Sequence, residues 1–199
     1  LLQYINSKNY VNIHSWFNLA KNNYYMKYLF PMALLVSSFA FSQEAESTNL
    51  QETLDVKKAG FEQRASAEKK KIYAEGIESV VKSGITSTAL QVGDKAIDFT
   101  LKNPKGESVK LYDELKKGPV VLTWYRGGWC PYCNITLHYL QEELPNFKKA
   151  GANLLALTPE TPDSSLSTIE KNNLEFEVLS DLDNVIAKQY GIVFKLTPE

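Results

Sequence analysis

The chain has 199 residues, of which 44% are hydrophobic and 23% charged, and its net charge is −1 with both histidines neutral. These values are ordinary for one globular domain with an apolar core, and neither a basic excess nor an acidic tail indicates nucleic acid or a strongly charged partner. The chain has two cysteines, Cys130 and Cys133. Two are too few to staple a small disulfide-rich fold, so a chemical role for the pair is favoured over scaffolding.

Residues 1–25 have an unusual composition. They begin without methionine, contain no acidic residue and are crowded with Asn and Tyr. Our hypothesis is that this segment is upstream sequence translated from a misplaced start. The alternative is a genuine, disordered leader.

Residues 26–42 have the pattern of a secretory signal peptide. A short cationic start at Met26 and Lys27 precedes an apolar run from Leu29 to Phe41, and small residues follow. The run is shorter than the about 20 residues that a membrane span needs. We therefore expect cleavage after Ser42, export to the periplasm or cell envelope, and no stable membrane insertion after cleavage. In that oxidising space a nearby cysteine pair rests as a disulfide unless it is reduced.

Residues 43–88 are expected to form a helical N-terminal extension. From Leu50 to Lys82 the sequence is rich in Ala, Glu, Lys and Gln, and its apolar residues are spaced as one helical face: Leu54, Phe61, Ala65, Ile72, Tyr73, Ile77, Val80 and Val81. We predict that this amphipathic helix breaks near Gly60 and closes at Gly84. It either packs on the domain or a second subunit, or is a solvated and partly frayed helix.

Residues 89–199 show the texture of a single α/β domain. Two alternating segments, 96–101 and 108–113, flank the turn residues Asn103 to Gly106, which predicts a β-hairpin. Helices and apolar strands then alternate: a helical turn over 112–117, strand 119–125, helix 130–144 interrupted by Pro145, strand 152–158, helix 163–173 capped by Asp163 or Ser164, strand 176–181 and helix 182–191. This order predicts a largely parallel sheet with right-handed crossovers. Because the sequence ends soon after Gly191, we expect C-terminal elements of the domain to be missing.

The stretch TWYRGGWCPYCN, residues 123–134, carries the cysteine pair. A strand runs into a short loop, and Pro131 suits the first position of the following helix, so Cys130 should be its N-cap. There its sulfur faces the free amides of the first turn at the positive helix end, which favours the thiolate and lowers the thiol pKa. Cys133 lies one turn later and is expected to be half-buried, close enough to form a disulfide with Cys130.

Five neighbours are expected to support this pair: Arg126, Gly127, Gly128, Trp129 and Pro131. Arg126 can add positive charge near the sulfur of Cys130. The two glycines are expected to let the backbone pass close to that sulfur and to leave room for a substrate.

A metal site or a structural disulfide would account for the pair less well. A zinc site needs four ligands, and only His138 remains as a further soft ligand beyond the expected signal peptide. A purely structural disulfide would close a very small loop and constrain little of the unfolded chain. The residues therefore favour a redox pair without a metal, and His138 is most simply a surface or packing residue.

The run from about Leu90 to Pro198 resembles the alkyl hydroperoxide reductase/thiol-specific antioxidant (AhpC/TSA) family, within it the peroxiredoxin-like branch with a cysteine pair. The resemblance is carried by LQVGDKAIDFTL, GPVVLTWYRGGWCPYCN, LQEELPNFKKAGANLLALTPETPDSS and LEFEVLSDLDNVIAKQYGIVF. It implies a thioredoxin-like fold and no cofactor. It also implies that Cys130 attacks a hydroperoxide and becomes a sulfenic acid, that Cys133 resolves this to a disulfide, and that an external thioredoxin-type dithiol restores the pair.

The chain departs from the peroxiredoxin pattern at two places that matter for function. Typical members carry Thr or Ser three residues before the attacking cysteine, and that place is Gly127 here. They also use an arginine well downstream, for which Arg126 is our hypothetical substitute. The alternative function is therefore a thioredoxin-like thiol–disulfide oxidoreductase acting on protein disulfides. A third hypothesis, based on the expected loss of C-terminal elements, is a non-enzymatic fragment or binding module.

Overall fold

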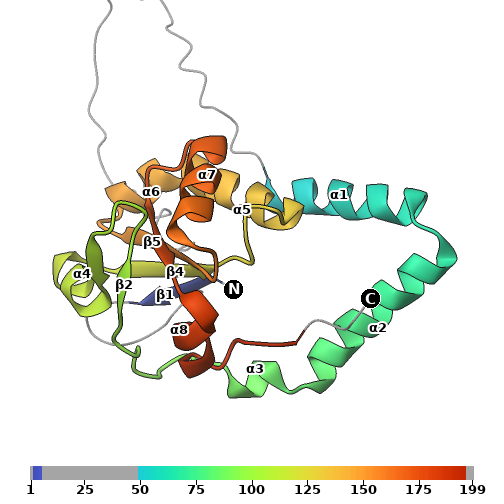
Figure 1. The fold of residues 1–199 in the computed structure, drawn as a ribbon, viewed down its shortest axis with the longest axis horizontal. Coiled ribbons are helices and arrows are strands. Elements are labelled where there is room, and N and C mark those ends of the chain that lie inside the picture. The colour runs from blue at the N-terminus through green and yellow to red at the C-terminus, as the bar shows by residue number, and fades with distance from the viewer. Residues whose placement is uncertain (1, 6–48, 196–199) are drawn as a thin grey trace, which may run out of the picture.

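The computed structural model describes residues 2–5 and 49–195 and shows one mixed sheet covered by helices on both faces (Figure 1). The strands are β1 (Leu2–Ile5), β2 (Thr100–Lys102), β3 (Ser108–Lys110), β4 (Val120–Trp124), β5 (Asn153–Thr158) and β6 (Glu177–Ser180). They lie in the order β1-β4-β5-β6-β2-β3. The pairs β4–β5 and β5–β6 are parallel and the other pairs are antiparallel. The predicted α/β class with a parallel centre is confirmed.

The central strands are buried on both faces because neighbouring residues along each strand enter different cores. Leu122 of β4 belongs to one apolar cluster together with residues of α4 (Leu111–Lys117) and α8 (Val185–Gln189). Val121 belongs to the second cluster, on the face covered by α5 (Pro131–Glu142), α6 (Leu144–Lys149) and α7 (Pro162–Asn172). The unbroken apolar runs of β4 and β5 are the pattern that such doubly covered strands require.

The N-terminal hairpin is confirmed, with strands shorter than predicted. β2 and β3 pair antiparallel over three residues each, and residues 96–99 lie outside the ladder. The side-chain oxygen of Asn103 accepts the amides of Lys105 and Glu107, and Gly106 has a φ of +82°. These two features close the turn as its residues predicted.

The helices after the cysteine pair also follow the predicted pattern, with one corrected cap. The helical segment is interrupted at Glu143, which lies between α5 and α6, and Pro145 lies in the first turn of α6. Residues 182–184 form a 3-10 turn before α8, and Gly191 follows with a φ of +68°. Thr161, rather than Asp163 or Ser164, caps α7, because its hydroxyl accepts the Ser164 amide and Pro162 occupies the first helical position.

The N-terminal extension forms an arm of two helices, α1 (Leu50–Arg64) and α2 (Ala67–Lys82), followed by the short α3 (Ile85–Thr88). The predicted break near Gly60 is wrong, since the helix continues through Gly60 and ends at Arg64. Ser66 begins the new helix by accepting the Lys69 amide, which is a capping role that serine fills well.

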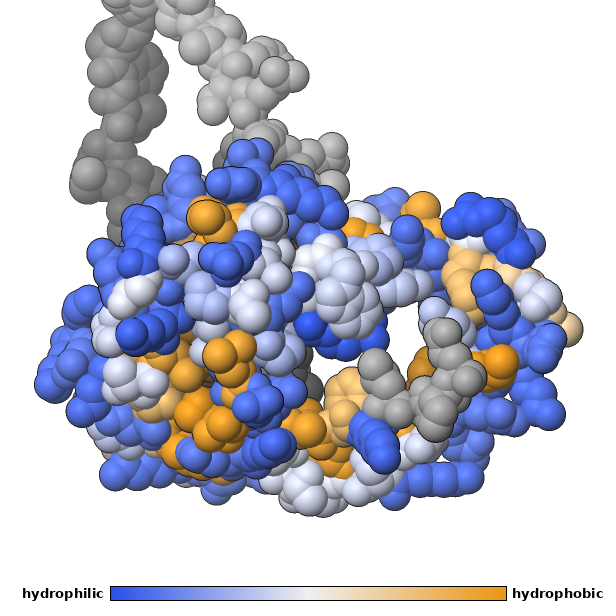
Figure 2. All heavy atoms as spheres, viewed as in Figure 1, coloured by the Kyte–Doolittle hydropathy of each residue, from blue (hydrophilic) through white to orange (hydrophobic). Residues whose placement is uncertain are grey.

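The arm touches the domain at its two ends. α1 contacts α5, and Thr88 donates a hydrogen bond to the Gly191 carbonyl over 3.0 Å. Figure 2 shows apolar residues exposed along the arm, and in α2 these include Ile77 at 66% and Val81 at 70% exposure. Neither α1 nor α2 contains a buried residue. The domain therefore holds the arm mainly by its ends.

Two sequence-based predictions fall largely outside the described residues. The proposed signal peptide, residues 26–42, lies wholly outside, and of residues 1–25 the structure describes only the backbone of β1, which pairs with β4. Among the helices that are described, none combines the length and apolar character needed to cross a membrane.

Candidate functional site

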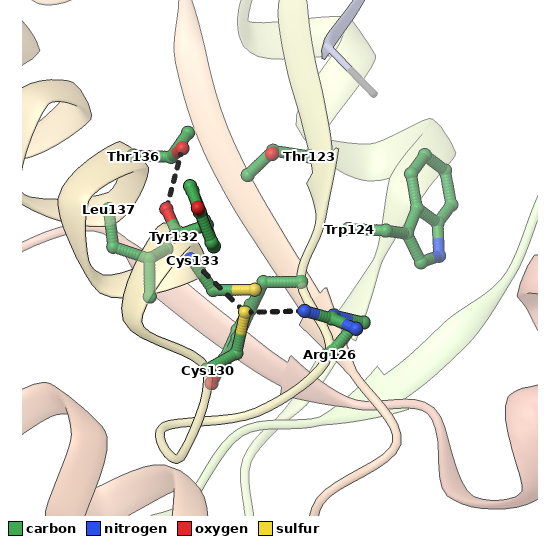
Figure 3. Close-up of a pocket in the computed structure, with 9 residues that line it drawn as sticks. Thr123, Trp124, Arg126, Cys130, Tyr132, Cys133, Thr136 and Leu137 are labelled. Carbon is green, nitrogen blue, oxygen red and sulfur yellow. Dashed lines mark hydrogen bonds between the residues drawn. The ribbon is translucent and has the colours of Figure 1, made fainter. Parts of the chain in front are cut away.

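The cysteine pair lies at the carboxyl edge of the parallel strands, where β4 passes through residues 125–130 into α5. A pocket of about 340 Å³ opens beside both sulfurs. Figure 3 shows its lining residues, which are Thr123, Trp124, Tyr125, Arg126, Cys130, Tyr132, Cys133, Thr136 and Leu137. The end of β4, the loop 125–130 and the first two turns of α5 supply these residues, so one short segment of sequence lines the pocket.

Cys130 is the N-cap of α5, as predicted. Its backbone is extended, Pro131 follows at the first helical position, and the Cys130 Sγ accepts the Cys133 amide over 3.3 Å. This amide has no partner within the helix, so the sulfur completes the first turn. A thiolate at this position also faces the positive end of the helix dipole.

Arg126 supplies the second contact to the same sulfur. Its Nη2 donates to the Cys130 Sγ over 3.1 Å, and Figure 3 shows the guanidinium beside the two sulfurs. The guanidinium also lies over the Trp129 ring, 5.1 Å from the ring centroid. A planar cation stacked on an aromatic face is held in place without losing its charge.

These contacts shift the pKa values of the two thiols in opposite directions. Burial acts most strongly and raises the pKa of Cys130, but hydrogen bonds from the Cys133 thiol, the Cys133 amide and Arg126, with the charge of Arg126, bring it below its ordinary value. Burial raises the pKa of Cys133, and the neighbouring Cys130 thiolate raises it further. Both cysteines are free thiols in this structure. Cys130 is therefore the thiol that ionises first.

Cys130, the thiol with the lowered pKa, is buried. Its side chain is 0% exposed, whereas Cys133 is half-buried as expected. The reason is the same geometry that lowers the pKa: the sulfur lies under the Arg126 guanidinium and against the first turn of α5. A reactant must reach Cys130 through the pocket.

The two glycines also differ from their predicted role. A Cβ on Gly127, whose φ is +153°, would overlap the Trp129 indole and crowd the Glu160 carboxylate, and a Cβ on Gly128 would overlap the Thr168 hydroxyl. The space beside these glycines is thus occupied by side chains and offers no room for a substrate. Glycine is needed here because the loop packs tightly against the end of β5 and against α7.

The polar residues behind the cysteine loop were not predicted from the sequence. Both carboxylate oxygens of Glu160, which follows β5, lie 3.1 Å from the Gly128 amide. Asn134 donates to the carbonyls of Gly128 and Cys130. Because carboxyl ends of parallel strands meet at one edge, the position of Glu160 just after a buried strand was the available signal.

His138 takes no part in the site. Its imidazole is 65% exposed and lies 3.3 Å from Glu142 on the outer face of α5. Within residues 49–195, no group of three or more His, Cys, Asp or Glu side chains is arranged to hold a metal ion.

Residues 92–198 match the model of the AhpC/TSA family. Peroxiredoxin Bcp of Escherichia coli K12 is 31% identical over 103 residues, which are 52% of this chain and 65% of that protein. Thiol-disulfide oxidoreductase ResA of Bacillus thuringiensis subsp. konkukian is 29% identical over 105 residues, 52% of this chain and 60% of that protein. The chain thus spans less than two thirds of the length of either relative.

The fold has a counterpart among solved structures. The crystal structure of peroxidoxin BcpB from Mycobacterium tuberculosis superposes with a TM-score of 0.50 at 24% identity, covering 52% of this chain and 67% of that one. At this identity the likeness concerns the fold, and it confirms the expected thioredoxin-like arrangement of sheet and helices.

Proposed function

Because the chain belongs to the AhpC/TSA family, we propose that it is a thiol-dependent oxidoreductase that reduces hydroperoxides with Cys130 and Cys133. The observation that carries the proposal is the Cys130 sulfur, which accepts both the Cys133 amide and the Arg126 guanidinium. Donors aimed at a sulfur stabilise its thiolate, and the thiolate is the nucleophile in thiol chemistry.

In the first step the Cys130 thiolate attacks one oxygen of the hydroperoxide. An S–O bond forms, the O–O bond breaks, and the leaving alkoxide takes a proton to become an alcohol, or water when the substrate is hydrogen peroxide. The sulfur is oxidised to a sulfenic acid and the peroxide is reduced. Since Cys130 is buried, the peroxide reaches its sulfur through the pocket that Cys130 and Arg126 line.

In the second step Cys133 resolves the sulfenic acid. Its sulfur attacks the Cys130 sulfur, the S–S bond forms, and the S–O bond breaks with release of water. An external dithiol of the thioredoxin type then reduces the disulfide and is itself oxidised. The raised pKa of Cys133 suits this order, because Cys133 stays protonated until Cys130 has lost its negative charge.

The experiment uses the full chain in a coupled assay with thioredoxin, its reductase and NADPH. We expect hydrogen peroxide or tert-butyl hydroperoxide to drive NADPH oxidation, Cys130→Ser to abolish it, and Cys133→Ser to leave a sulfenate that dimedone traps at Cys130. Full turnover by the Cys130→Ser variant would contradict the proposal.

A second candidate is a thiol–disulfide oxidoreductase. Two observations favour it: the similarity to a protein named as such, and Gly127 at the place where peroxiredoxins carry a hydroxyl that holds the peroxide. Reduction of insulin disulfides without consumption of peroxide would select this candidate. Peroxide turnover with rapid sulfenate formation would select the first.

We propose in addition that the protein is exported after cleavage behind Ser42, from the pattern of residues 26–42. Mass spectrometry of the protein from its native cells should find Gln43 as the N-terminus. Native peptides that include residues 1–25 would contradict both this proposal and the hypothesis of a misplaced start.

A further inference from the structure

The Gly128 amide, in the turn between β4 and α5, is held by a residue from another part of the chain. Glu160 lies between β5 and α7, and its Oε1 and Oε2 are each 3.1 Å from this amide. A backbone amide shared by both oxygens of a carboxylate makes a charge-assisted hydrogen bond, which is stronger than one between neutral groups. The contact joins two segments that are 32 residues apart in the sequence.

The carbonyl of the same residue is held from the opposite side. Asn134 Nδ2 donates to the Gly128 carbonyl over 2.7 Å and to the Cys130 carbonyl over 3.0 Å. The Asn134 Oδ1 accepts from Asn172 Nδ2 of α7 over 2.9 Å. Both polar groups of the Gly128 backbone are therefore fixed, one by Glu160 and the other by an asparagine that α7 orients.

Packing leaves the loop little room to move. A side chain on Gly128 would collide with the Thr168 hydroxyl of α7, and one on Gly127 would crowd the Glu160 carboxylate. Two residues after Gly128, Cys130 must take the extended backbone of an N-cap so that its sulfur meets the Cys133 amide. The position of the sulfur thus depends on where Glu160 holds the preceding residues.

We propose that Glu160 is a positioning residue for the reaction of Cys130: its carboxylate, through the Gly128 amide, holds the loop in the shape that brings the Cys130 sulfur to the Cys133 amide and Arg126. The inference rests on Cys130 being the reactive thiol of the proposed function. Glu160 touches neither sulfur and acts through the backbone.

A direct effect of the Glu160 charge and a positioning effect predict opposite changes in how easily the Cys130 thiolate forms when the Glu160 carboxylate is removed. If its negative charge acted directly on Cys130, removing it would make the thiolate easier to form. If Glu160 acts by position, losing its hydrogen bond loosens the loop, weakens the two contacts to the sulfur and makes the thiolate harder to form. The sign of the change separates these two roles.

The test uses the full chain in a Cys133→Ser background, so that one thiol titrates. Thiolate absorbance at 240 nm and the iodoacetamide alkylation rate are measured against pH for Glu160→Ala and Glu160→Gln. We expect Glu160→Ala to shift the titration of Cys130 to higher pH and to slow alkylation at pH 7 several-fold. Glu160→Gln keeps a carbonyl acceptor for Gly128 and should stay within about twofold of the parent.

Glu170→Ala, which removes an exposed carboxylate from α7, is the matched control and should leave the titration unchanged. A Glu160→Ala titration that matches the parent or shifts to lower pH would overturn the inference. Equal effects of Glu160→Ala and Glu160→Gln would overturn it as well, because the acceptor would not matter.

A measurement on the unmodified protein covers the case in which a variant does not fold. The Gly128 amide, which Glu160 accepts, should exchange its proton with solvent slowly in NMR hydrogen exchange, and fast exchange of this amide would refute the hydrogen bond. Both readouts are independent of turnover. If peroxide and disulfide assays fail while Glu160→Ala still shifts the titration of Cys130, the proposed function fails and the positioning role stands.

Discussion

The Arg126 guanidinium lies 3.1 Å from the Cys130 sulfur and at the same time rests on the Trp129 ring. One exposed side chain therefore both stabilises the thiolate and covers it. Trp129 is itself 64% exposed, so the ring on which the guanidinium lies faces the solvent.

Replacing Arg126 should reduce the reactivity of Cys130. Arg126→Ala removes a hydrogen bond and a positive charge, so the pKa of Cys130 should rise and alkylation at pH 7 should slow by roughly three- to tenfold, a range reduced for solvent screening of an exposed cation. Arg126→Lys keeps the charge but not the planar guanidinium, so its alkylation rate should lie between those of the wild type and Arg126→Ala. The measurement is the iodoacetamide rate, and an unchanged rate in Arg126→Ala would contradict the assignment.

The reduced wild-type protein should show two separate thiol ionisations. The pKa of Cys130 is lowered and that of Cys133 is raised, and the two groups interact, so the steps belong to the pair. The first thiolate should form below, and the second above, the value of about 8.5 of a free cysteine. Absorbance at 240 nm against pH checks this, and a single two-thiol step near the free value would speak against the site geometry.

Gly128→Ala should destabilise the protein through a clash with α7. The new methyl group overlaps the Thr168 hydroxyl, and overpacking at a tight contact costs about 1–3 kcal/mol in the free energy of unfolding. Thr168→Ala removes the obstructing hydroxyl, so the double variant should be less destabilised than the sum of the single variants. Urea unfolding of the three variants measures the coupling, and strict additivity would show that the two residues do not meet.

Tyr125, at the end of the strand that leads into the cysteine loop, should resist ionisation in alkali. Burial first, and then the negative charge of Glu160, raise the pKa of Tyr125 to about 12. Since the unfolded chain ionises its tyrosines near about pH 10, the contribution of Tyr125 to stability is complete below about pH 10 and is lost as the pH rises towards 12.

In the Tyr125→Phe variant, the free energy of unfolding should fall less between neutral and alkaline pH than it does in the wild type. The substitution removes one hydroxyl, which faces Thr158, Ser165 and Thr168, so it should change the free energy of unfolding at pH 7 by about 1 kcal/mol or less. Urea midpoints at pH 7, 9 and 11 provide the comparison. Tyr190, whose pKa burial also raises, accounts for the loss that should persist in the variant. An identical alkaline loss in Tyr125→Phe and wild type would contradict the raised pKa.

Much of the site was predictable because its strongest signals are local. Pro131 at the first helical position makes Cys130 the N-cap, and the spacing of the two cysteines puts the Cys133 amide within reach of the first sulfur. Arg126, four residues earlier, needs only a tight loop to return to the same sulfur. The break in the N-terminal helix was placed wrongly because glycine only weakens a helix, whereas Ser66 actively caps a new one.

The strand, the loop, the helix that begins at Cys130 and the more acidic of the two thiols could all be predicted from residues 119–144, because they depend on contacts within a few residues. The burial of Cys130 and the contacts of Glu160 and Thr168 with Gly128 depend on the packing of distant segments and could not be predicted in this way. The parallel pairing of β4 with β5 sets Trp124 beside Leu157, and this register carries the residues after each strand to the same edge of the sheet. The hydrophobic periodicity of one segment does not show which side chain from a distant segment will lie beside it at this edge of the sheet.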